Sequence, residues 1–479
     1  MKKVVIIGAG VSGLTAGIFL KKNGYDCEII EKNREAGGNL TGWNRNGYHI
    51  DNCIHWLTGT RKGNKLYSLW KEVGALDDNT EIYNAEFFFS SEKDGQSVFF
   101  YRDPEKARRK MLAISYSDKD EINRFFDAVG VCVKTIKGSK NPINLAKEAA
   151  VILRYGKVSL NELARKFKSP LLSCAFTDFI GGEFSSIGLI FAYSAFASGN
   201  GGIPKGGSCE MAKRILNKYL SLGGKIRTGA EVADIITENG RAKEVILADK
   251  THVEADFVVS SCDPSITFSK FLPKESMPKQ LKYLYSKRAE FPVFSAFHVA
   301  LSAYTDTLPF KGTAAFDTDP INIDNKYISR LTVREFSHEK KYAPDKKSII
   351  QCLIFLHESS CNEWIELKKS SPEEYKRKKE KTASEIVASL EKHFPELKGK
   401  LQIIDTWTPA TYKRYLNSLC GSFMSFAVTG KKMPIPSGII PRGFSNIVLA
   451  GQWMRAPGGL PIALRSGVAA AKKVISLSQ

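Results

Sequence analysis

The first thirty positions of the chain show two hydrophobic patterns in turn. The run from Val4 to Ile7 is continuously apolar, as in a strand that is buried on both faces of a parallel sheet. Leu14, Ala16 and Leu20 then place apolar side chains on one face of a helix, and a second strand-like segment runs from Asp26 to Ile30. This order predicts a β-α-β unit, the element from which helix-covered parallel sheets are built.

The same patterns return twice, far from the N-terminus. Residues 203–264 predict a glycine turn, a helix and a strand-rich segment that begins near Val232 and ends in the apolar run Ala255 to Val259. Residues 446–475 predict an apolar strand, a glycine-rich loop and a helix that begins near Pro461.

The loop between the first strand and helix has the chemistry of a phosphate cradle. Its sequence GAGVSG gives Gly8, Gly10 and Gly13 the G-x-G-x-x-G spacing. Glycine permits the tight turn, the close approach of the backbone to a pyrophosphate and the packing of helix on strand. The helix that starts at Val11 and Ser12 offers free N–H groups to the phosphates, and Glu31 ends the second strand. The combination predicts a dinucleotide site, with Glu31 accepting hydrogen bonds from ribose hydroxyls.

Composition narrows the class of protein but not its fold. The chain has 479 residues, which is too long for one hydrophobic core, so we expect more than one domain. Its formal net charge is +20, which indicates either a lysine-rich solvated surface or anionic partners. The nine cysteines form no C-x-x-C pair, which argues against a zinc ribbon and a disulfide framework and favours a reducing cytoplasm. We expect a cytoplasmic protein that is soluble or peripheral to the inner face of a membrane.

The residues just after Glu31 distinguish FAD from NAD. The doublet Gly37-Gly38 comes shortly after the second strand, as in flavoproteins of the glutathione-reductase and amine-oxidase type. The chain has no second G-x-G-x-x-G for a nicotinamide domain and no redox-active cysteine pair. FAD is therefore the predicted cofactor.

Three further segments carry a more specific resemblance. They are PKGG at 204–207, TPATYKRYLNSLCGSF at 408–423 and AGQWMRAPGGLPIALRSG at 450–467. Together with the N-terminal motif, the chain resembles the phytoene desaturase, carotenoid isomerase and retinol saturase family of FAD oxidoreductases. The resemblance implies an α/β fold with a Rossmann-like FAD-binding domain of the glutathione-reductase/amine-oxidase type and an interleaved α+β substrate domain. It divides the chain into a discontiguous FAD domain (1–85, 200–290 and 416–479) and a substrate domain (86–199 and 291–415).

The same resemblance assigns residues to the cofactor. The N-terminal glycines, Val11, Ser12 and Glu31 would hold the adenosine and pyrophosphate, and Val232 would contact the adenine through its backbone. The other residues implied to bind FAD are Lys32, Arg34, Gly38, Gly451, Gln452, Gly459, Leu460 and Pro461. Gln452 stands where the wider superfamily often has an acidic residue that binds the ribityl chain or the pyrophosphate. A helix that begins near Pro461 would also stabilise negative charge on a reduced flavin.

The implied reaction is hydride transfer through flavin that desaturates or saturates a carbon–carbon bond of an apolar polyene or isoprenoid-like substrate. A redox-neutral isomerase of the same family, an amine or porphyrinogen oxidase, and a lipid-binding protein without activity remain alternatives. His55 and Trp56 are candidates for substrate contact or proton handling, although a lone histidine is more often structural. The sequence shows no metal-binding cluster and no nucleophile elbow.

The binding partners that we expect follow from a basic segment of the chain and from the absence of a second dinucleotide motif for nicotinamide. Between Lys134 and Lys168, nine basic residues face two acidic ones, interleaved with apolar residues. Such a segment is a solvated helical face or a surface that binds an anionic membrane. The electron partner could be a quinone, oxygen or a protein. The expected substrate is an apolar lipid-like molecule. The sequence contains no nucleic-acid recognition motif, so no nucleic-acid partner is expected.

Overall fold

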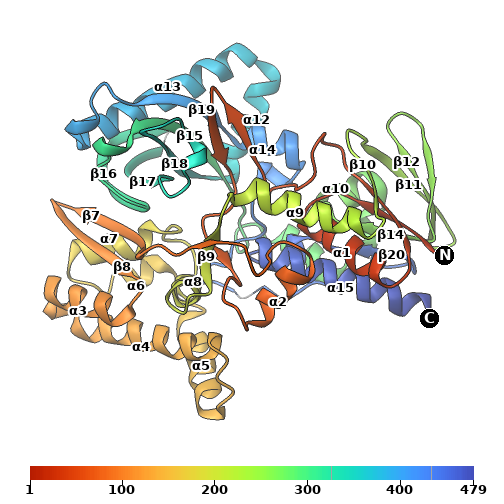
Figure 1. Ribbon diagram of the computed structural model, residues 1–479, viewed down its shortest axis with the longest axis horizontal. Helices are drawn as coiled ribbons and strands as arrows, with labels where there is room; N and C mark the ends of the chain where they lie inside the picture. The colour runs from red at the N-terminus through yellow and green to blue at the C-terminus, as the bar shows by residue number, and fades with distance from the viewer. Residues whose placement is uncertain (325, 433) are drawn as a thin grey trace.

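The computed structural model describes residues 1–324, 326–432 and 434–479. Its elements gather in three regions (Figure 1): a parallel sheet with its helices near the two termini, a large sheet at the opposite end, and a group of helices below that sheet. No helix in the described ranges combines the length and the apolar character that crossing a bilayer requires.

The parallel sheet has the strand order β10-β2-β1-β14-β20. Every neighbouring pair in it is parallel. Its strands are β1 (Lys3–Ile7), β2 (Asp26–Ile30), β10 (Lys225–Arg227), β14 (Phe257–Ser260) and β20 (Ile447–Leu449). Val4 and Ile6 pack into one core and Val5 and Ile7 into another, which is why the run is continuously apolar. The predicted fold class is confirmed.

Three helices lie beside this sheet. They are α1 (Val11–Lys22), α9 (Gly207–Ser221) and α15 (Leu460–Ser478), and α1 contacts both of the others. Gly467 of α15 permits the close approach to α1, because a Cβ there would lie 2.4 Å from the Ser12 carbonyl oxygen. A small antiparallel sheet follows α9; its strands are β11 (Val232–Glu238), β12 (Arg241–Leu247) and β13 (His252–Glu254).

The large sheet has the order β19-β15-β18-β17-β16-β7-β8 and combines two distant parts of the chain. Its strands are β7 (Phe87–Lys93), β8 (Gln96–Tyr101), β15 (Phe294–Tyr304), β16 (Thr313–Ile323), β17 (Lys326–Glu335), β18 (Lys347–His357) and β19 (Gln402–Trp407). Only the β7–β16 pair is parallel among the pairs described. Three helices accompany this sheet: α12 (Glu358–Ser370), α13 (Pro372–His393) and α14 (Pro409–Leu416).

A further group of helices forms a lobe next to β7 and β8 (Figure 1). They are α3 (Pro104–Ile114), α4 (Lys119–Ile136), α5 (Pro142–Tyr155), α6 (Leu160–Ala164), α7 (Pro170–Asp178) and α8 (Ser186–Ala197). The aromatic runs of the sequence form its core, where Phe88, Phe89 and Phe100 pack with residues of α4, α7 and α8. Short connecting elements complete the chain: β3 (Gly42–Arg45), β4 (Tyr48–Asp51), β5 (Leu57–Thr58), β6 (Ile82–Tyr83), β9 (Gly201–Pro204), α2 (Lys65–Glu72), α10 (Pro264–Ile266) and α11 (Lys279–Ser286).

Candidate active site

A cavity of about 1560 Å³ joins the parallel sheet to the large sheet and the helical lobe. At one end it is lined by the residues that follow the carboxyl ends of the parallel strands: Gly8 after β1, Glu31 after β2, Ser261 after β14 and Gly451 after β20. In open α/β sheets this edge is where ligands bind. At the other end the lining comes from α7, α8 and β17, so one cavity connects two chemically different walls.

The cavity brings together all but two of the residues predicted to bind the cofactor. Those that line it are Gly8, Gly10, Val11, Ser12, Glu31, Lys32, Gly38, Val232, Gly451, Gln452, Gly459, Leu460 and Pro461. Gly13 does not; a Cβ there would lie 2.0 Å from the Gly8 carbonyl oxygen, so this glycine permits packing of α1 against β1. Arg34 is exposed and does not line the cavity, and its contact with the dinucleotide stays a prediction.

Two helix N-termini open into the cavity. The helix α1 is preceded by Gly10 and α15 by Gly459; neither N-cap residue has a side chain that could accept a hydrogen bond, and neither first turn contains an acidic residue. The N-terminus of α9, in contrast, is occupied, because Ser208 N donates to the Asp51 carboxylate at 2.6 Å. The free N–H groups of α1 and α15 therefore fit a ligand that carries phosphates and takes up negative charge.

The Glu31 carboxylate is buried and partly satisfied by the protein. One oxygen accepts from Ala9 N at 2.8 Å, and the other accepts from Asn33 N and Asn33 Nδ2 at 2.8 and 2.9 Å. A carboxylate has about four acceptor positions, so one remains for a ribose hydroxyl. Gly10 fits the same ligand, because a Cβ built there meets no atom within 4 Å and would project into open space. These residues fit a flavin dinucleotide.

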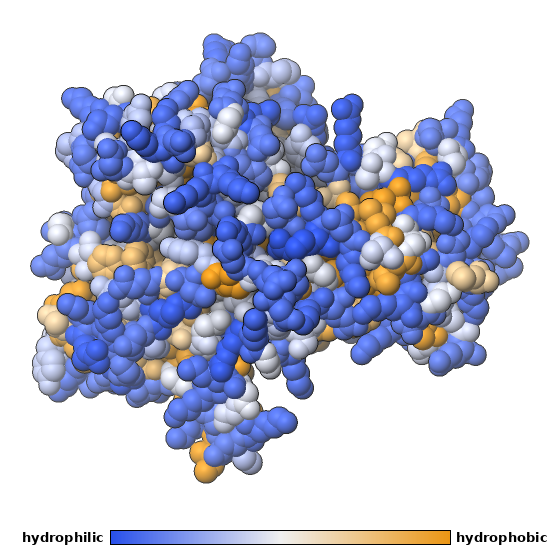
Figure 2. Space-filling view, in the orientation of Figure 1, coloured by the Kyte–Doolittle hydropathy of each residue, from blue (hydrophilic) through white to orange (hydrophobic). Residues whose placement is uncertain are grey.

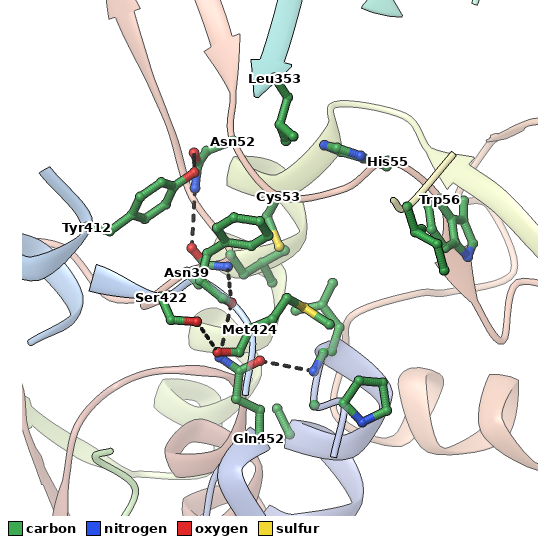
Figure 3. A pocket seen from close by; sticks show the side chains of 18 of the residues that line it. Asn39, Asn52, Cys53, His55, Trp56, Leu353, Tyr412, Ser422, Met424 and Gln452 are labelled. Carbon is green, nitrogen blue, oxygen red and sulfur yellow. Dashed lines mark hydrogen bonds between the residues drawn. The ribbon is translucent and has the colours of Figure 1, made fainter. Parts of the chain in front are cut away.

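Gln452 uses both ends of its amide (Figure 3). Its nitrogen donates to the Phe423 carbonyl at 3.1 Å, and its oxygen accepts from Gly459 N at 3.0 Å. A carboxylate cannot donate, so the glutamine amide can bridge a carbonyl oxygen and an N–H group where a glutamate could not. The bridge holds the loop before α15 against the 419–424 segment and explains why an amide stands at this position.

We predict that Gln452→Glu weakens flavin binding about tenfold, because it loses one hydrogen bond and sets a carboxylate against a carbonyl oxygen, at a cost of about 1–2 kcal/mol. Titration of the apoprotein with flavin, followed by fluorescence quenching, measures the change. Gln402→Glu is the matched control, since Gln402 lies in the distant strand β19 with an exposed side chain. Unchanged affinity in Gln452→Glu would show that the bridge does not support the cofactor site.

A chain of hydrogen bonds near Gln452 was not foreseen from the sequence. Tyr412 OH donates to Asn52 at 2.8 Å, Asn52 donates to Asn39 at 3.3 Å, and Asn39 donates to the Phe423 carbonyl at 3.2 Å (Figure 3). The sequence motifs pointed to the neighbourhood of two of these residues, since Asn39 follows the Gly37-Gly38 doublet and Tyr412 lies in the 408–423 segment. The pairing itself joins residues up to 384 positions apart and has no local sequence pattern.

His55 and Trp56 both line the cavity, but in different ways. Trp56 packs its ring against Phe88 and Phe179, with centroids 5.1 and 5.2 Å apart, and so belongs to the aromatic wall. The His55 side chain is exposed within the cavity (Figure 3). Desolvation of the ring by the protein atoms around it, with a smaller contribution from the Arg334 charge, lowers the pKa of His55 to about 3. The ring is therefore neutral near pH 7, where it is a hydrogen-bond partner and not a charged group.

Comparison with known proteins decides the family. The family model described as flavin containing amine oxidoreductase matches residues 11–475. The chain belongs to this family. Flavin is thus the cofactor class, and the resemblance predicted from the motifs is confirmed by the relatives.

Two relatives and one solved structure illustrate the match. A prolycopene isomerase of Daucus carota is 25% identical over 93% of this chain and 75% of its own length. A 4,4'-diapophytoene desaturase of a Methylomonas species is 25% identical over 55% of this chain and 54% of its own length. The crystal structure of an oxidoreductase from Methanosarcina mazei shares 20% identity, covers 98% of this chain and 100% of its own, and has a TM-score of 0.63. At that identity the structural match concerns the fold alone.

Proposed function

We propose that this flavin oxidoreductase binds FAD and desaturates or saturates a carbon–carbon bond of an apolar polyene or isoprenoid-like substrate. The observation that carries the proposal is the continuity of one cavity from the dinucleotide motifs to an aromatic wall. That wall belongs to α7, α8, β7 and the loops beside them; its aromatic members include Phe88, Phe179, Phe184, Phe191 and Phe196. A long apolar molecule can lie along it with its reacting bond at the flavin end.

When bound, flavin supplies the hydride chemistry, and the residues of the chain position the substrate and exclude water. Trp56 and the phenylalanines give the substrate an apolar surface. His55, neutral near pH 7, neither repels an apolar chain nor holds a charge that would need water. The α15 N-terminus faces the place where negative charge develops on reduction. Electrons are exchanged with a quinone, oxygen or a protein.

A redox-neutral double-bond isomerase is the second candidate. It uses the same cavity and the same flavin, and the relative from Daucus carota is named prolycopene isomerase. The mass of the product separates the two reactions, since an isomerase leaves it unchanged and the redox reaction changes it by two hydrogens.

An amine oxidase is the third candidate, because the family takes its name from such enzymes. The cavity does not favour it. Its wall carries the buried cation Arg334, whose charge repels an ammonium group. Release of hydrogen peroxide from small amines would support this candidate over the first two.

The experiment is to incubate the flavin-loaded enzyme anaerobically, in its oxidised and its reduced form, with polyene hydrocarbons in detergent micelles. If a more saturated polyene bleaches the absorbance of the oxidised flavin, or a more unsaturated one restores the absorbance of the reduced flavin, the proposal is supported. In either case the mass of the product should differ from that of the substrate by two hydrogens. If no polyene changes the flavin spectrum or is converted to any product, the proposal is wrong.

We further propose that the segment 134–168 rests on an anionic membrane surface from which the substrate is drawn. Its nine basic side chains are all exposed, and none forms an ion pair with the residues that the structure describes. The helix α5 also exposes large apolar side chains, with Ile143 at 66% and Leu153 at 81% of their full accessible surface. Figure 2 shows apolar atoms at the lower tip of this lobe. Because α5 packs on α4 and α8, and α8 lines the cavity, the membrane would lie next to the substrate wall.

The prediction is that Lys140→Gln, Lys147→Gln and Lys157→Gln, combined, weaken binding to vesicles that contain phosphatidylglycerol by tenfold or more. Each basic residue near an anionic bilayer contributes about 1 kcal/mol. Sedimentation with vesicles, with and without the anionic lipid, measures the effect, and flavin content is expected to stay the same.

The matched control replaces three lysines elsewhere, Lys376, Lys398 and Lys400, which are also exposed and without an ion-pair partner in the described chain. The control keeps the same net charge as the triple variant. Equal loss of binding in both variants would assign the effect to total charge, and no loss in either would remove the membrane proposal.

A further inference from the structure

A buried histidine lies where the cavity meets the hydrogen-bond chain of Tyr412. His298 belongs to β15, is 3% exposed and lines the cavity. Its ring stacks on Trp407 of the neighbouring strand β19, with centroids 4.5 Å apart and planes inclined by 9°. Its Nε2 lies 3.1 Å from Tyr412 OH. The ring is therefore held on one face and at one nitrogen, and it cannot turn over without losing the contact at Nε2.

The hydrogen-bond chain runs in only one direction, because it ends on a carbonyl oxygen. The Phe423 carbonyl cannot donate, so the amide group of Asn39 that faces it at 3.2 Å is the nitrogen. The Asn39 oxygen then accepts from the Asn52 nitrogen at 3.3 Å. The Asn52 oxygen is left for Tyr412 OH at 2.8 Å (Figure 3). An amide oxygen cannot donate, so Tyr412 gives its only hydroxyl proton to Asn52.

This direction fixes the tautomer of His298. The oxygen of Tyr412 accepts from Trp407 Nε1 at 3.1 Å, and its own proton is already given to Asn52. His298 Nε2 must therefore carry a proton and donate it to the same oxygen. Burial lowers the pKa of His298 well below its ordinary value, with a smaller contribution from His55, so the ring is neutral near pH 7. A neutral imidazole has one N–H group, which leaves Nδ1 with a free lone pair.

The free lone pair of Nδ1 reaches the cavity. Nδ1 has no hydrogen-bond partner among the residues that the structure describes. The polar side-chain atoms of the described chain that are sealed and lack a partner do not include Nδ1. This nitrogen therefore keeps accessible surface, and that surface lies in the cavity that His298 lines. His55 lines the cavity too, but no hydrogen bond within the described chain orients its ring.

The same chain connects His298 with the end of the cavity that fits the flavin. Gly459 N, at the start of α15, donates to Gln452, and Gln452 donates to the Phe423 carbonyl. That carbonyl also accepts from Asn39, so it joins the two halves of the chain. The ring of Phe423 lies beside His298, with centroids 6.2 Å apart. His298 and the loop before α15 are therefore parts of one hydrogen-bonded unit.

We propose that His298 is the base of the reaction and that its Nδ1 takes the proton that leaves the substrate during desaturation. This rests on the proposed function and specifies desaturation as its direction. A hydride passes with its two electrons from one carbon to the oxidised flavin, and a proton passes from the adjacent carbon to Nδ1. The electron pair of the second C–H bond becomes the new π bond. His298 returns the proton to water after the product has left the cavity.

A weak base is sufficient for this step. Departure of the hydride leaves positive charge on the carbon chain, and this charge makes the adjacent C–H bond strongly acidic. Saturation would instead need a protonated imidazole as the acid, and the low pKa of His298 makes that form scarce near pH 7. Tyr412 is a positioning residue, because it touches His298 and holds the proton of the ring on Nε2.

The first test measures how fast a polyene bleaches the oxidised flavin in a single anaerobic turnover. The probe is the polyene hydrocarbon that bleaches the unmodified enzyme fastest, from a panel that includes phytoene and 4,4'-diapophytoene. His298→Gln keeps a donor toward Tyr412 but removes the basic nitrogen, so the rate constant should fall about a hundredfold or more. The probe concentration that gives half the maximal rate should change by less than about threefold. His252→Gln is the matched control, since His252 is exposed in the distant strand β13.

The second test is independent of activity and uses NMR of protein whose histidines carry a nitrogen isotope label. We expect the signals that disappear in His298→Gln to show a protonated Nε2 and an unprotonated Nδ1. Tyr412→Phe removes the acceptor, so both tautomers of His298 should appear, and bleaching should slow about threefold to tenfold. Flavin content shows whether each variant is folded. If His298→Gln loads no flavin, His298→Asn takes its place, and the tautomer found in the unmodified enzyme stands by itself.

Bleaching of His298→Gln at the rate of the unmodified enzyme, or a protonated Nδ1 with an unprotonated Nε2, overturns the inference. An unmodified enzyme that converts polyenes but desaturates none overturns it as well. Desaturation that proceeds equally well without His298 contradicts only the role of this residue and leaves the proposed function intact. If no polyene changes the flavin spectrum or is converted by the unmodified enzyme, the proposed function is wrong, and the role of His298 falls with it.

Discussion

Gly10→Ala is expected to give a folded protein that has lost nearly all of its flavin. Gly10 has φ −72° and ψ 176°, which alanine adopts without strain, and a Cβ built there meets no atom within 4 Å. The methyl group would instead occupy the cavity in front of the free N–H groups of α1, where the pyrophosphate has to approach the backbone. Losing charge-assisted hydrogen bonds there costs about 3 kcal/mol or more, which is over a hundredfold in affinity. Flavin absorbance per protein and apoprotein titration measure the effect.

Two other glycines make this test specific. Gly13→Ala should lower both the thermal midpoint and flavin binding, because its Cβ would lie 2.0 Å from the Gly8 carbonyl oxygen and 2.9 Å from Ser261 Oγ. Gly130 lies within α4 with nothing within 4 Å, so Gly130→Ala should leave flavin binding unchanged and raise stability slightly. A Gly10→Ala protein that retains its flavin would show that the pyrophosphate does not contact this loop.

The parallel sheet and its phosphate-binding loop were predictable because their causes are local. Val4 to Ile7 form a continuously apolar strand, Gly8 has φ +98°, a Cβ at Gly13 would meet the Gly8 carbonyl oxygen, and Glu31 follows the neighbouring strand. These features all lie within the first thirty-one residues and therefore leave a recognisable pattern in the sequence, although β14 and Ser261 also pack against them. The aromatic runs were readable as core, but only the fold shows that some of their members also face the cavity.

Arg334 shows why the cavity wall formed by β17 could not be predicted from the sequence. Its carbonyl partner, Ile54, lies 280 positions away, and β17 contains two arginines that look alike in the sequence. Arg330 is neutralised by Asp178, from a helix 152 positions earlier, whereas Arg334 forms no ion pair with the residues that the structure describes. The packing of the helical lobe on the sheet decides which arginine is paired with a carboxylate. The spacing of residues in the sequence does not predict this packing.

The PKGG motif at 204–207 was identified by its resemblance to a family, but the resemblance did not explain why glycine is needed there. A Cβ at Gly207 would lie 2.0 Å from an oxygen of the Asp51 carboxylate and 2.1 Å from Tyr342 OH, and the residue has φ +58°. The glycine is therefore required by a buried carboxylate, which is itself held at the N-terminus of α9. The function of the motif follows from Asp51, to which the sequence drew no attention.

Asp51→Asn is expected to destabilise the protein by about 3 kcal/mol, although it changes neither size nor shape. Asp51 is 4% exposed. One of its oxygens accepts from Cys53 N, Ile54 N and Ser208 Oγ, and the other accepts from Ser208 N and Tyr342 OH. Both oxygens face backbone N–H groups, which cannot accept. The amide nitrogen of asparagine would therefore meet a donor in either orientation, and the negative charge at the α9 N-terminus would be lost.

Two further variants separate the hydrogen bonds from the charge. Tyr342→Phe removes one donor and leaves the carboxylate its other partners, so it should cost about 1 kcal/mol. Asp345→Asn makes the same chemical change at an exposed site nearby and should stay within about 0.5 kcal/mol of the unmodified protein. Denaturant unfolding, followed by flavin release and by intrinsic fluorescence, measures all three. Because Asp51 joins the 51–54 loop, α9 and Tyr342, its loss should release flavin and unfold the chain in one transition. Equal stability of Asp51→Asn and Asp345→Asn would mean that the carboxylate does not hold these segments together.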